Sequence, residues 1–241
     1  MDQAAFLESY DPTAFERPSV AVDLILMSVV DGAPAVLLTR RDQHPFQGGW
    51  ALPGGFVGIG ESLDDAAHRL LAEKAHMADA YVEQLYTFGA VERDPRMRII
   101  SVAYFALIPA CAFAAALKGA PELALARLTV QPGGPVEARL PEGEPLTLAF
   151  DHGEMLGVAM LRLRGKLDYS GIAFALLPER FTLRALQDVY EAILDTRLNK
   201  PAFRRRMLDR GWLEPTGARE TGASFRPAEL YRYRPPGEAP R

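Results

Sequence analysis

The distribution of apolar residues predicts two pairs of strands in the first half of the chain. Residues 19–30 (SVAVDLILMSVV) and 33–41 (APAVLLTRR) are rich in β-branched residues and flank the turn-forming sequence DGAP. Residues 81–91 and 98–108 have a similar character and flank the charged turn ERDPRMR. Each pair therefore predicts two neighbouring strands joined by a turn.

A loop and a helix lie between these two pairs. Residues 41–61 are rich in Gly and Pro with embedded aromatic residues, which predicts a long loop, and loops of this length in compact domains are often functional. In residues 62–78 the apolar positions have helical spacing, and Ser62 with Asp65 matches a capping box. The predicted apolar stripe of this helix consists of Leu63, Ala66, Ala67, Leu70 and Leu71.

The last quarter of the chain has the pattern of a winged helix-turn-helix. After residues 176–181 (LLPERF) the composition becomes basic, and Thr182 can cap a helix with 3.6-residue periodicity. The apolar face of that helix consists of Leu183, Leu186, Val189, Tyr190, Ile193 and Leu194. A turn, a second helix that starts at Pro201 and ends at Gly211, and two strands follow, at residues 195–200, 201–210, 212–217 and 228–235. Two helices and a two-stranded wing are typical of DNA-binding domains.

Two stretches are harder to interpret. Residues 99–117 are uncharged and nearly long enough to span a bilayer, but Pro109 divides them into a β-branched, aromatic half and an Ala-rich half. We therefore expect a buried strand, a turn and the start of a helix or loop there, not a membrane span. The sequence does not place the strands of residues 112–145, and helical spacing resumes at 151–167.

The composition is that of an ordinary globular protein. The 241 residues are 49% hydrophobic and 24% charged, which is enough for one large domain or two small ones. The single cysteine, Cys111, excludes an intrachain disulfide, and we expect it to be a small buried apolar residue. The N-terminus has no signal-peptide pattern, so we expect a cytoplasmic protein that does not associate with membranes.

The charge is unevenly distributed along the chain. Residues 178–241 carry 13 Lys and Arg against 9 Asp and Glu, a net charge of +4, whereas the rest carries 14 against 22, a net charge of −8. Such a division indicates two parts with different partners, the basic part being suited to nucleic acid.

The predicted helix at residues 62–78 has the frame of a metal site without most of its ligands. Acidic residues at positions 70, 73 and 74 would lie on one helical face and hold Mg²⁺, which polarises a diphosphate and activates water. This sequence has Leu70, Glu73 and Lys74 there, so one carboxylate remains and a cation stands where the metal should lie. Asp64 and Asp65 could compensate, although they lie one to two turns earlier.

This segment resembles the Nudix box of the Nudix hydrolases, whose pattern is G-x5-E-x7-R-E-U-x-E-E-x-G-U, where U is aliphatic. The matching residues follow WALPGGFV and are Gly55, Glu61, Arg69 and Glu73. The departures from the pattern are Leu70, Lys74 and His76. In Nudix enzymes the replaced glutamates commonly bind metal or act as the base. The resemblance therefore implies a degenerate box with no catalytic residues, no required cofactor and at most weak Mg²⁺ binding.

Most of the chain resembles one branch of that superfamily, the Nudix-related transcriptional regulators of the NrtR type. The resemblance rests on ERPSVAVDLIL, FQGGWALPGGFV, RDPRMRIISVAYFAL, LAFDH, the long string LRGKLDYSGIAFALLPERFTLRALQDVYEAIL, and NKPAFRRRML. It implies a Nudix-like α/β/α sandwich with a mixed sheet in residues 1–165 and a small winged helix-turn-helix in residues 166–241. It further implies a homodimeric repressor that senses ADP-ribose or a related nucleotide and controls genes of NAD metabolism or sugar use.

The nucleotide pocket is expected to use aromatic and basic residues together with backbone N–H groups. Phe46 and Trp50 could stack on an adenine, and the N–H groups of Gly54, Gly55 and Phe56 could face phosphate oxygens. The arginines that could hold a diphosphate are Arg40, Arg41, Arg93 and Arg96. The alternative for each is an ordinary core aromatic or a surface arginine. The four histidines, His44, His68, His76 and His152, show no metal-binding spacing, and we expect surface or hydrogen-bonding roles.

The second helix of the predicted winged helix carries the sequence FRRRMLDR. In isolation this run would be a solvated helix face, but within a helix-turn-helix it favours DNA binding. One or two arginines can reach guanine edges while the others contact phosphates. The candidates for DNA contact are Thr182, Arg184, Lys200, Arg204, Arg205, Arg206, Arg210, Arg219 and Arg226.

Two other functions fit parts of the sequence. One is a nucleoside-diphosphate pyrophosphatase with an altered metal site, for example an ADP-ribose pyrophosphatase. The other is a nucleotide-binding scaffold whose basic tail contacts another protein. The degenerate box together with the basic helix-turn-helix favours the regulator.

Overall fold

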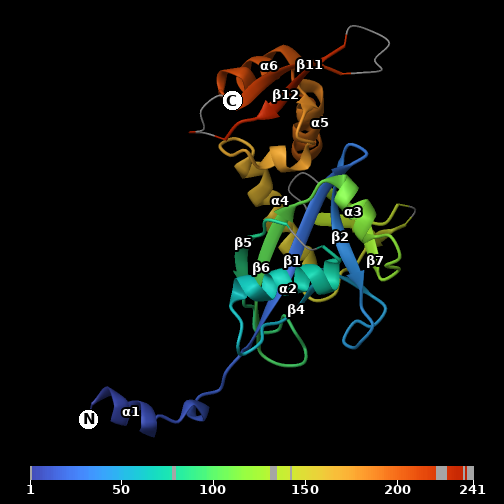
Figure 1. Ribbon diagram of the computed structural model, residues 1–241. Helices are drawn as coiled ribbons and strands as arrows, with labels where there is room; N and C mark the ends of the chain where they lie inside the picture. The colour runs from blue at the N-terminus through green and yellow to red at the C-terminus, as the bar shows by residue number, and fades with distance from the viewer. Residues whose placement is uncertain are drawn as a thin grey trace.

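Strand β1 (Ser19–Val30) is the centre of a nine-stranded mixed sheet. The computed structural model describes residues 2–77, 80–130, 135–141, 143–220, 227–235 and 237 (Figure 1). The strand order is β5-β6-β1-β2-β7-β8-β9, with β3 paired to β2 and β4 paired to β1. β1 runs parallel to β6 and antiparallel to β2 and β4. The other strands are β2 (Ala33–Arg40), β3 (Trp50–Ala51), β4 (Gly54–Phe56), β5 (Glu83–Phe88), β6 (Ile99–Leu107), β7 (Leu123–Val130), β8 (Val136–Arg139) and β9 (Pro145–Leu146).

Helices cover both faces of this sheet, so the predicted α/β/α sandwich with a mixed sheet is confirmed. Helices α2 (Leu63–Ala75) and α3 (Ala110–Ala116) share one apolar core with the sheet, and α4 (His152–Lys166) packs on the opposite face. Residues of β1 alternate between the two cores: Leu24 and Leu26 belong to the first, and Ile25 and Met27 to the second. Burial on both faces explains why this strand is continuously apolar.

The predicted winged helix follows α4 as a compact arrangement of two helices and three short strands (Figure 1). Its helices are α5 (Leu183–Leu194) and α6 (Lys200–Asp209), and its strands are β10 (Phe181–Thr182), β11 (Leu213–Arg219) and β12 (Glu229–Tyr233). A short 3₁₀ helix, η2 (Ile172–Leu176), precedes it. At the other end of the chain, α1 (Gln3–Ser9) and η1 (Pro12–Ala14) bury no residue and lie apart from the sheet.

Several elements follow the sequence closely. The turn after β1 places Asp31 and Gly32 at positive φ, as a tight hairpin requires. Ser62 and Asp65 form the predicted capping box of α2, and Thr182 caps α5 by accepting a hydrogen bond from the Ala185 N–H at 3.1 Å. The uncharged stretch at 99–117 is strand β6, a turn at Pro109 and helix α3.

Other elements differ from expectation. The segment 41–61, expected to be a loop throughout, contains β3 and β4, which are too short to show a periodic pattern. Residues 112–145, whose strands the sequence does not place, contain β7, β8 and the start of the edge strand β9. Cys111 is exposed and not buried, because α3 turns Phe113 and Ala116 toward the core and leaves the side of Cys111 outward. Across the described ranges, no helix is both long and apolar enough to cross a membrane.

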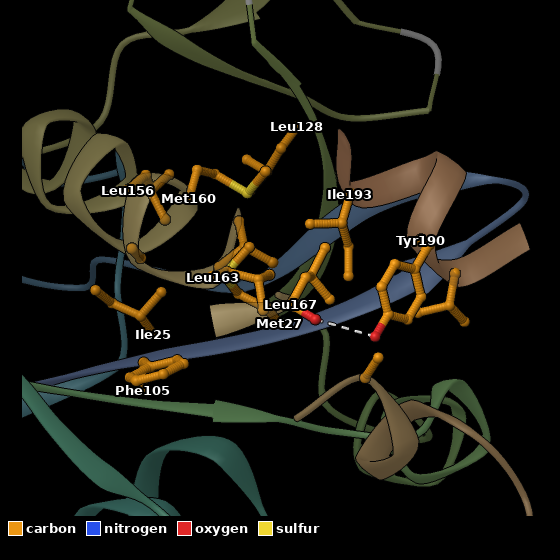
Figure 2. Packing of buried hydrophobic residues seen from close by; sticks show 14 of the residues in the cluster. Ile25, Met27, Phe105, Leu128, Leu156, Met160, Leu163, Leu167, Tyr190 and Ile193 are labelled. Atoms are coloured by element: carbon orange, nitrogen blue, oxygen red, sulfur yellow. Dashed lines mark hydrogen bonds between the residues drawn. The ribbon is translucent and has the colours of Figure 1, made fainter. Parts of the chain in front are cut away.

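One apolar core joins the sheet domain to the winged helix. The cluster that contains Ile25 and Phe105 continues through Met160 and Leu163 of α4 to Tyr190 and Ile193 of α5 (Figure 2). The Tyr190 hydroxyl also donates a hydrogen bond to the Leu167 carbonyl at 3.1 Å. The winged helix is therefore packed against the rest of the protein and does not hang on a free linker.

This shared core predicts that both parts unfold together. Leu163→Ala removes a side chain that is 1% exposed, and truncation of a buried leucine costs about 2–5 kcal/mol of unfolding free energy. Trp50 lies in the sheet domain and Trp212 in the winged helix, so Trp212→Phe and Trp50→Phe backgrounds allow urea unfolding of each part to be followed by fluorescence. We expect Leu163→Ala to lower both midpoints equally.

Leu161→Ala on the same helix is the matched control, because Leu161 is 75% exposed and its truncation changes the unfolding free energy by no more than about 0.5 kcal/mol. If the Trp212 signal keeps its midpoint in Leu163→Ala while the Trp50 signal shifts, the core is not shared.

Candidate functional site

Arg69 is the centre of the degenerate Nudix box. Its guanidinium contacts both oxygens of the Glu61 carboxylate, at 3.0 Å and 2.5 Å, and a Glu73 oxygen at 3.3 Å. It also donates to the Phe56 carbonyl at 3.0 Å, which ties α2 to β4. Arg69 thus pairs with both glutamates of the box, and these contacts hold the loop against the helix.

The carboxylates of this segment already accept hydrogen bonds from other groups of the protein. Hydrogen bonds from Arg69 and from the Gly58 N–H lower the pKa of Glu61 to about 2. Asp64 accepts a hydrogen bond from the Tyr104 hydroxyl at 2.6 Å, and Asp65 is used in the helix cap. Within the part of the chain that the structure describes, no group of three His, Cys, Asp or Glu residues could hold a metal ion.

Leu70 and Lys74 replace the two other acidic positions in different ways. Leu70 is 1% exposed and packs under β4, so close that a Cβ added to Gly55 would lie 2.8 Å from its Cδ2 atom. A glycine at this position lets β4 approach the helix. Lys74, one turn further along α2, is exposed and lines a cleft beside β4. The residues present therefore do not fit the Mg²⁺ site of a Nudix enzyme.

That cleft is the candidate ligand site, with a volume of about 340 Å³. Its wall comes from β1, the loop after β2, β4 with the preceding Leu52, Lys74 of α2, the β5–β6 loop with the start of β6, and the segment that leads into α4. Of the residues expected to bind a ligand, Arg41, Gly54, Gly55, Phe56, Arg93 and Arg96 line it. It combines cationic groups with aromatic surface, which suits a nucleotide.

Phe150 contacts two of the arginines that line the cleft, Arg41 and Arg96. The Arg41 guanidinium lies over the Phe150 ring at 4.8 Å, and that of Arg96 lies 5.7 Å from the same ring. Arg96 also lies over Phe56 at 5.6 Å and forms an ion pair with Asp94 at 2.8 Å. Burial and the nearby Arg96 lower the pKa of Arg41, so an anion between these two guanidinium groups would relieve their repulsion.

The floor of the cleft is a buried polar cluster that begins helix α4. Arg93, 8% exposed, forms two hydrogen bonds to the Asp151 carboxylate, at 2.8 Å and 2.7 Å, and lies 3.6 Å from Asp23. His152 accepts a hydrogen bond from the Leu52 N–H at 2.8 Å, and burial lowers the pKa of this imidazole. Arg93 is thus committed to holding two carboxylates in place, whereas Arg41 and Arg96 face the cleft.

Three of the predicted ligand residues lie outside the cleft lining. Arg40 donates to the Gly48 carbonyl at 3.2 Å, and Trp50 packs against the core that contains α4. Phe46 is 47% exposed and contacts Phe150 edge-on at 4.9 Å, so it lies behind the cleft wall. The lining residues that were not predicted to bind the ligand include Asp23, Asp94, Phe150 and His152. They come from distant segments that only the folded chain brings together.

A second, larger cavity of about 570 Å³ lies where β6, α3 and η2 meet. Its walls are mainly apolar, from residues such as Phe105, Ile108 and Ile172, and among the residues that the structure describes they include no Arg or Lys. It therefore lacks groups that could hold a diphosphate.

The turn of the helix-turn-helix is organised by Glu191, a residue that sequence reasoning missed. Its carboxylate accepts hydrogen bonds from the Leu198 N–H at 3.0 Å, from Gln187 at 2.7 Å and from Arg197 at 2.8 Å. These bonds lower the pKa of Glu191 to about 2. They fix the angle at which α6 leaves α5, and thus the disposition of the basic helix.

The basic residues of the winged helix fall into two groups. Lys200, Arg204, Arg205 and Arg206 lie on α6 with exposed side chains, as a DNA-reading helix requires. Arg210 instead donates to the Leu167 carbonyl at 3.3 Å and the Asp168 carbonyl at 2.6 Å, so it joins the winged helix to the end of α4.

The other predicted DNA contacts lie around α6. Arg184 forms an ion pair with Asp188 at 2.7 Å, and Thr182 uses its hydroxyl to cap α5. Arg219 donates to the Pro227 carbonyl at 3.0 Å at the base of the wing. Arg226 lies outside the described residues.

Comparison with known proteins agrees with this two-part structure. The Nudix domain family matches residues 17–124, and the NrtR DNA-binding winged helix domain matches residues 173–233. The ADPR-responsive transcriptional repressor NtrR of Acinetobacter baylyi is 38% identical over 234 residues, which cover 96% of this chain and 88% of that relative.

Two solved structures of the Shewanella oneidensis NrtR are also similar. The full protein, crystallised with a 27mer DNA, has a TM-score of 0.73 and 34% identity, covering 89% of this chain and 93% of that chain. Its Nudix domain, crystallised with ADP ribose, has a TM-score of 0.50 and 32% identity, covering 68% of this chain and 99% of that chain. Fold, site and relatives thus define a Nudix-related transcriptional regulator. The chain belongs to the NrtR family, which confirms the resemblance found in the sequence.

The Glu61–Arg69 pair predicts a specific pH dependence of stability. The pKa of Glu61 is about 2 in the folded protein, against an ordinary value of 4.5, so its contribution is complete above about pH 5 and declines toward pH 2. Glu61→Gln should therefore be less stable than the parent protein at pH 7, and the gap should narrow as the pH falls. Urea unfolding at pH 7, 5 and 4 measures this.

Glu92→Gln is the control, since Glu92 is exposed and lies outside the box. A gap between the parent protein and Glu61→Gln that stays constant from pH 7 to pH 4 would contradict the ionic role of Glu61.

Proposed function

We propose that this protein is a ligand-responsive transcriptional repressor that binds operator DNA with α6 and the wing and binds ADP-ribose, or a related nucleotide, in the cleft beside β4. The observation that carries the proposal is the direct packing of a basic winged helix on the same helix, α4, whose first residues form the floor of the cleft. The ligand and DNA assignments are supported by the related Shewanella structures, complexed with DNA and with ADP ribose, and by the related ADPR-responsive repressor of Acinetobacter.

The chemistry of the cleft suits a nucleoside diphosphate. Arg41 and Arg96 supply positive charge, and Phe56 and Phe150 supply aromatic faces for a base. Because the guanidinium groups already lie over these rings, an anion would bind to groups that are largely positioned beforehand.

Helix α4 provides the physical route between ligand and DNA. Asp151 and His152 at its start belong to the cleft cluster, and Leu167 and Asp168 just after its end accept hydrogen bonds from Tyr190 and Arg210. A shift of Phe150 or Asp151 on ligand binding would therefore tilt α4 and reorient the winged helix. In a homodimer, the form we propose, two winged helices must match half-sites one helical turn apart, so a small rotation is enough to change affinity.

We further propose that the domain does not hydrolyse its ligand. The box residues Glu61 and Glu73 contact Arg69, Leu70 is apolar, and Lys74 is a cation, so the ligands for a catalytic metal are missing from the box. Genes of NAD metabolism or sugar use are the targets that the resemblance to NrtR-type regulators implies.

The first test measures fluorescence anisotropy of labelled DNA from the upstream region of the gene, with and without ADP-ribose. We expect salt-sensitive binding that resists competitor DNA, and a change in affinity of at least about fivefold on addition of ADP-ribose. Arg41→Gln should weaken the response to ADP-ribose by about tenfold or more, because it removes a charge-assisted hydrogen bond.

Arg40→Gln is the matched control, because this neighbouring arginine lies outside the cleft and should respond like the parent protein. Binding no stronger than to random DNA, with or without the nucleotide, would refute the repressor assignment. An equal loss of the ADP-ribose response in Arg41→Gln and Arg40→Gln would mean that the ligand does not bind in this cleft.

The DNA-reading surface makes a second prediction for the same assay. Arg205 is exposed on α6, and Arg205→Ala should weaken DNA binding and, if it contacts a phosphate, lower the slope of log affinity against log salt by about 1. Lys118→Ala removes a charge from an exposed position of the sheet domain and should leave both quantities unchanged. Equal effects of the two changes would mean that only overall charge matters and that α6 does not read DNA.

A further inference from the structure

Lys74 differs both from an ordinary surface lysine, because it lines the candidate cleft, and from a metal ligand of the Nudix type, because it is a cation. It lies four residues after Leu70 on the face of α2 that turns toward β4, and its side chain lines the candidate cleft. The same cleft is lined by Arg41, Arg96 and the backbone of Gly55. An ammonium group is thus added to a lining whose other charged residues are three arginines (Arg41, Arg93, Arg96) and three aspartates (Asp23, Asp42, Asp94).

The acidic groups near Lys74 are engaged elsewhere and do not neutralise it within the box. Glu73 contacts Arg69 at 3.3 Å, and Glu61 is held by Arg69 and the Gly58 N–H. Asp94 lies in the β5–β6 loop and lines the cleft. Its carboxylate accepts two hydrogen bonds from the Arg96 guanidinium. The four cations of the lining (Lys74, Arg41, Arg93 and Arg96) outnumber its three acids (Asp23, Asp42 and Asp94), which leaves a net charge of +1 for a ligand.

We propose that the Lys74 ammonium takes the place that a divalent cation has in a Nudix enzyme, and binds the diphosphate of the nucleotide directly. This rests on the function proposed above. Three cationic side chains, Lys74, Arg41 and Arg96, then neutralise the two negative charges of the diphosphate without any metal ion. Nucleotide binding by this protein is accordingly independent of divalent cations.

The exchange of a metal for an ammonium also separates binding from catalysis. Mg²⁺ holds phosphate oxygens and water together in one coordination sphere, which brings the nucleophile to the phosphorus. An ammonium donates three hydrogen bonds to oxygens but has no coordination position in which water becomes acidic. Lys74 can therefore hold a diphosphate as tightly as a sensor requires while leaving it uncleaved.

Isothermal titration calorimetry of the full-length protein tests this with ADP-ribose, ADP and adenosine as probes, in EDTA and in Mg²⁺. The parent protein should bind ADP-ribose equally, within about twofold, in both buffers. Lys74→Gln should weaken ADP-ribose and ADP by about tenfold or more, the usual size of a lost charge-assisted contact, and leave adenosine unaffected. Lys74→Arg, which keeps the charge, should retain more affinity than Lys74→Gln.

Lys74 is exposed, so these variants should fold, and Lys118→Gln controls for the general loss of one charge. The inference is overturned if the parent protein binds ADP-ribose only with Mg²⁺, or if Lys74→Gln binds like the parent. It is also overturned if Lys74→Arg and Lys74→Gln lose affinity equally. If the parent protein binds none of the probes in either buffer, the proposed nucleotide sensing itself fails, so the two failures are distinct.

Discussion

The packing of α4 between the sheet and α5 is the interaction on which the rest of the structure depends. Met160 and Leu163 are each 1% exposed, and they connect residues of β1 and β6 to Tyr190 and Ile193 of the winged helix (Figure 2). A fully buried side chain of this size contributes about 1.5–3 kcal/mol, so several of them hold the two parts more firmly than an exposed linker could. The winged helix is thereby a continuation of the sandwich, and α4 is one of the elements, together with β1, β2 and η2, against which α5 packs.

Polar contacts tie the start of α4 to the cleft and its end to the winged helix. At the start, Asp151 is bound by Arg93, and the loop before it carries Phe150 between the two cleft arginines. Near the end, Arg164 donates to the Ile193 carbonyl at 2.9 Å, and Arg210 holds the Asp168 carbonyl. Packed interiors change by discrete shifts and do not deform continuously, so a displacement at one end of the helix moves the other. Arg210, which the sequence analysis placed among the DNA contacts, thus also joins the winged helix to the end of α4.

The sequence predicts the parts of this structure that depend on local pattern. The capping box of α2, the hairpin after β1 and the amphipathic face of α5 all follow from spacing over a few residues. It could not predict that Phe150 and Asp23 line the same cleft, because no periodicity relates residues from separate elements. For the same reason the sequence could not distinguish Arg40 from Arg41. Both are basic and adjacent at the end of β2, and only the folded structure shows that Arg41 lines the cleft whereas Arg40 does not. Edge strands such as β9, which are two residues long, leave no pattern to read.

The altered Nudix box is physically consistent with a protein that binds its ligand without a metal. Three carboxylates on one face of a helix repel one another unless a cation lies between them, so a domain without Mg²⁺ gains nothing from keeping them. Leu70 replaces one carboxylate with buried apolar surface under β4, and the remaining Glu73 is neutralised by Arg69. The frame that positions β4 against α2 survives because Arg69, Glu61 and the close approach at Gly55 do not require the metal. The same substitutions that remove the metal ligands of the box therefore leave the frame of the pocket in place.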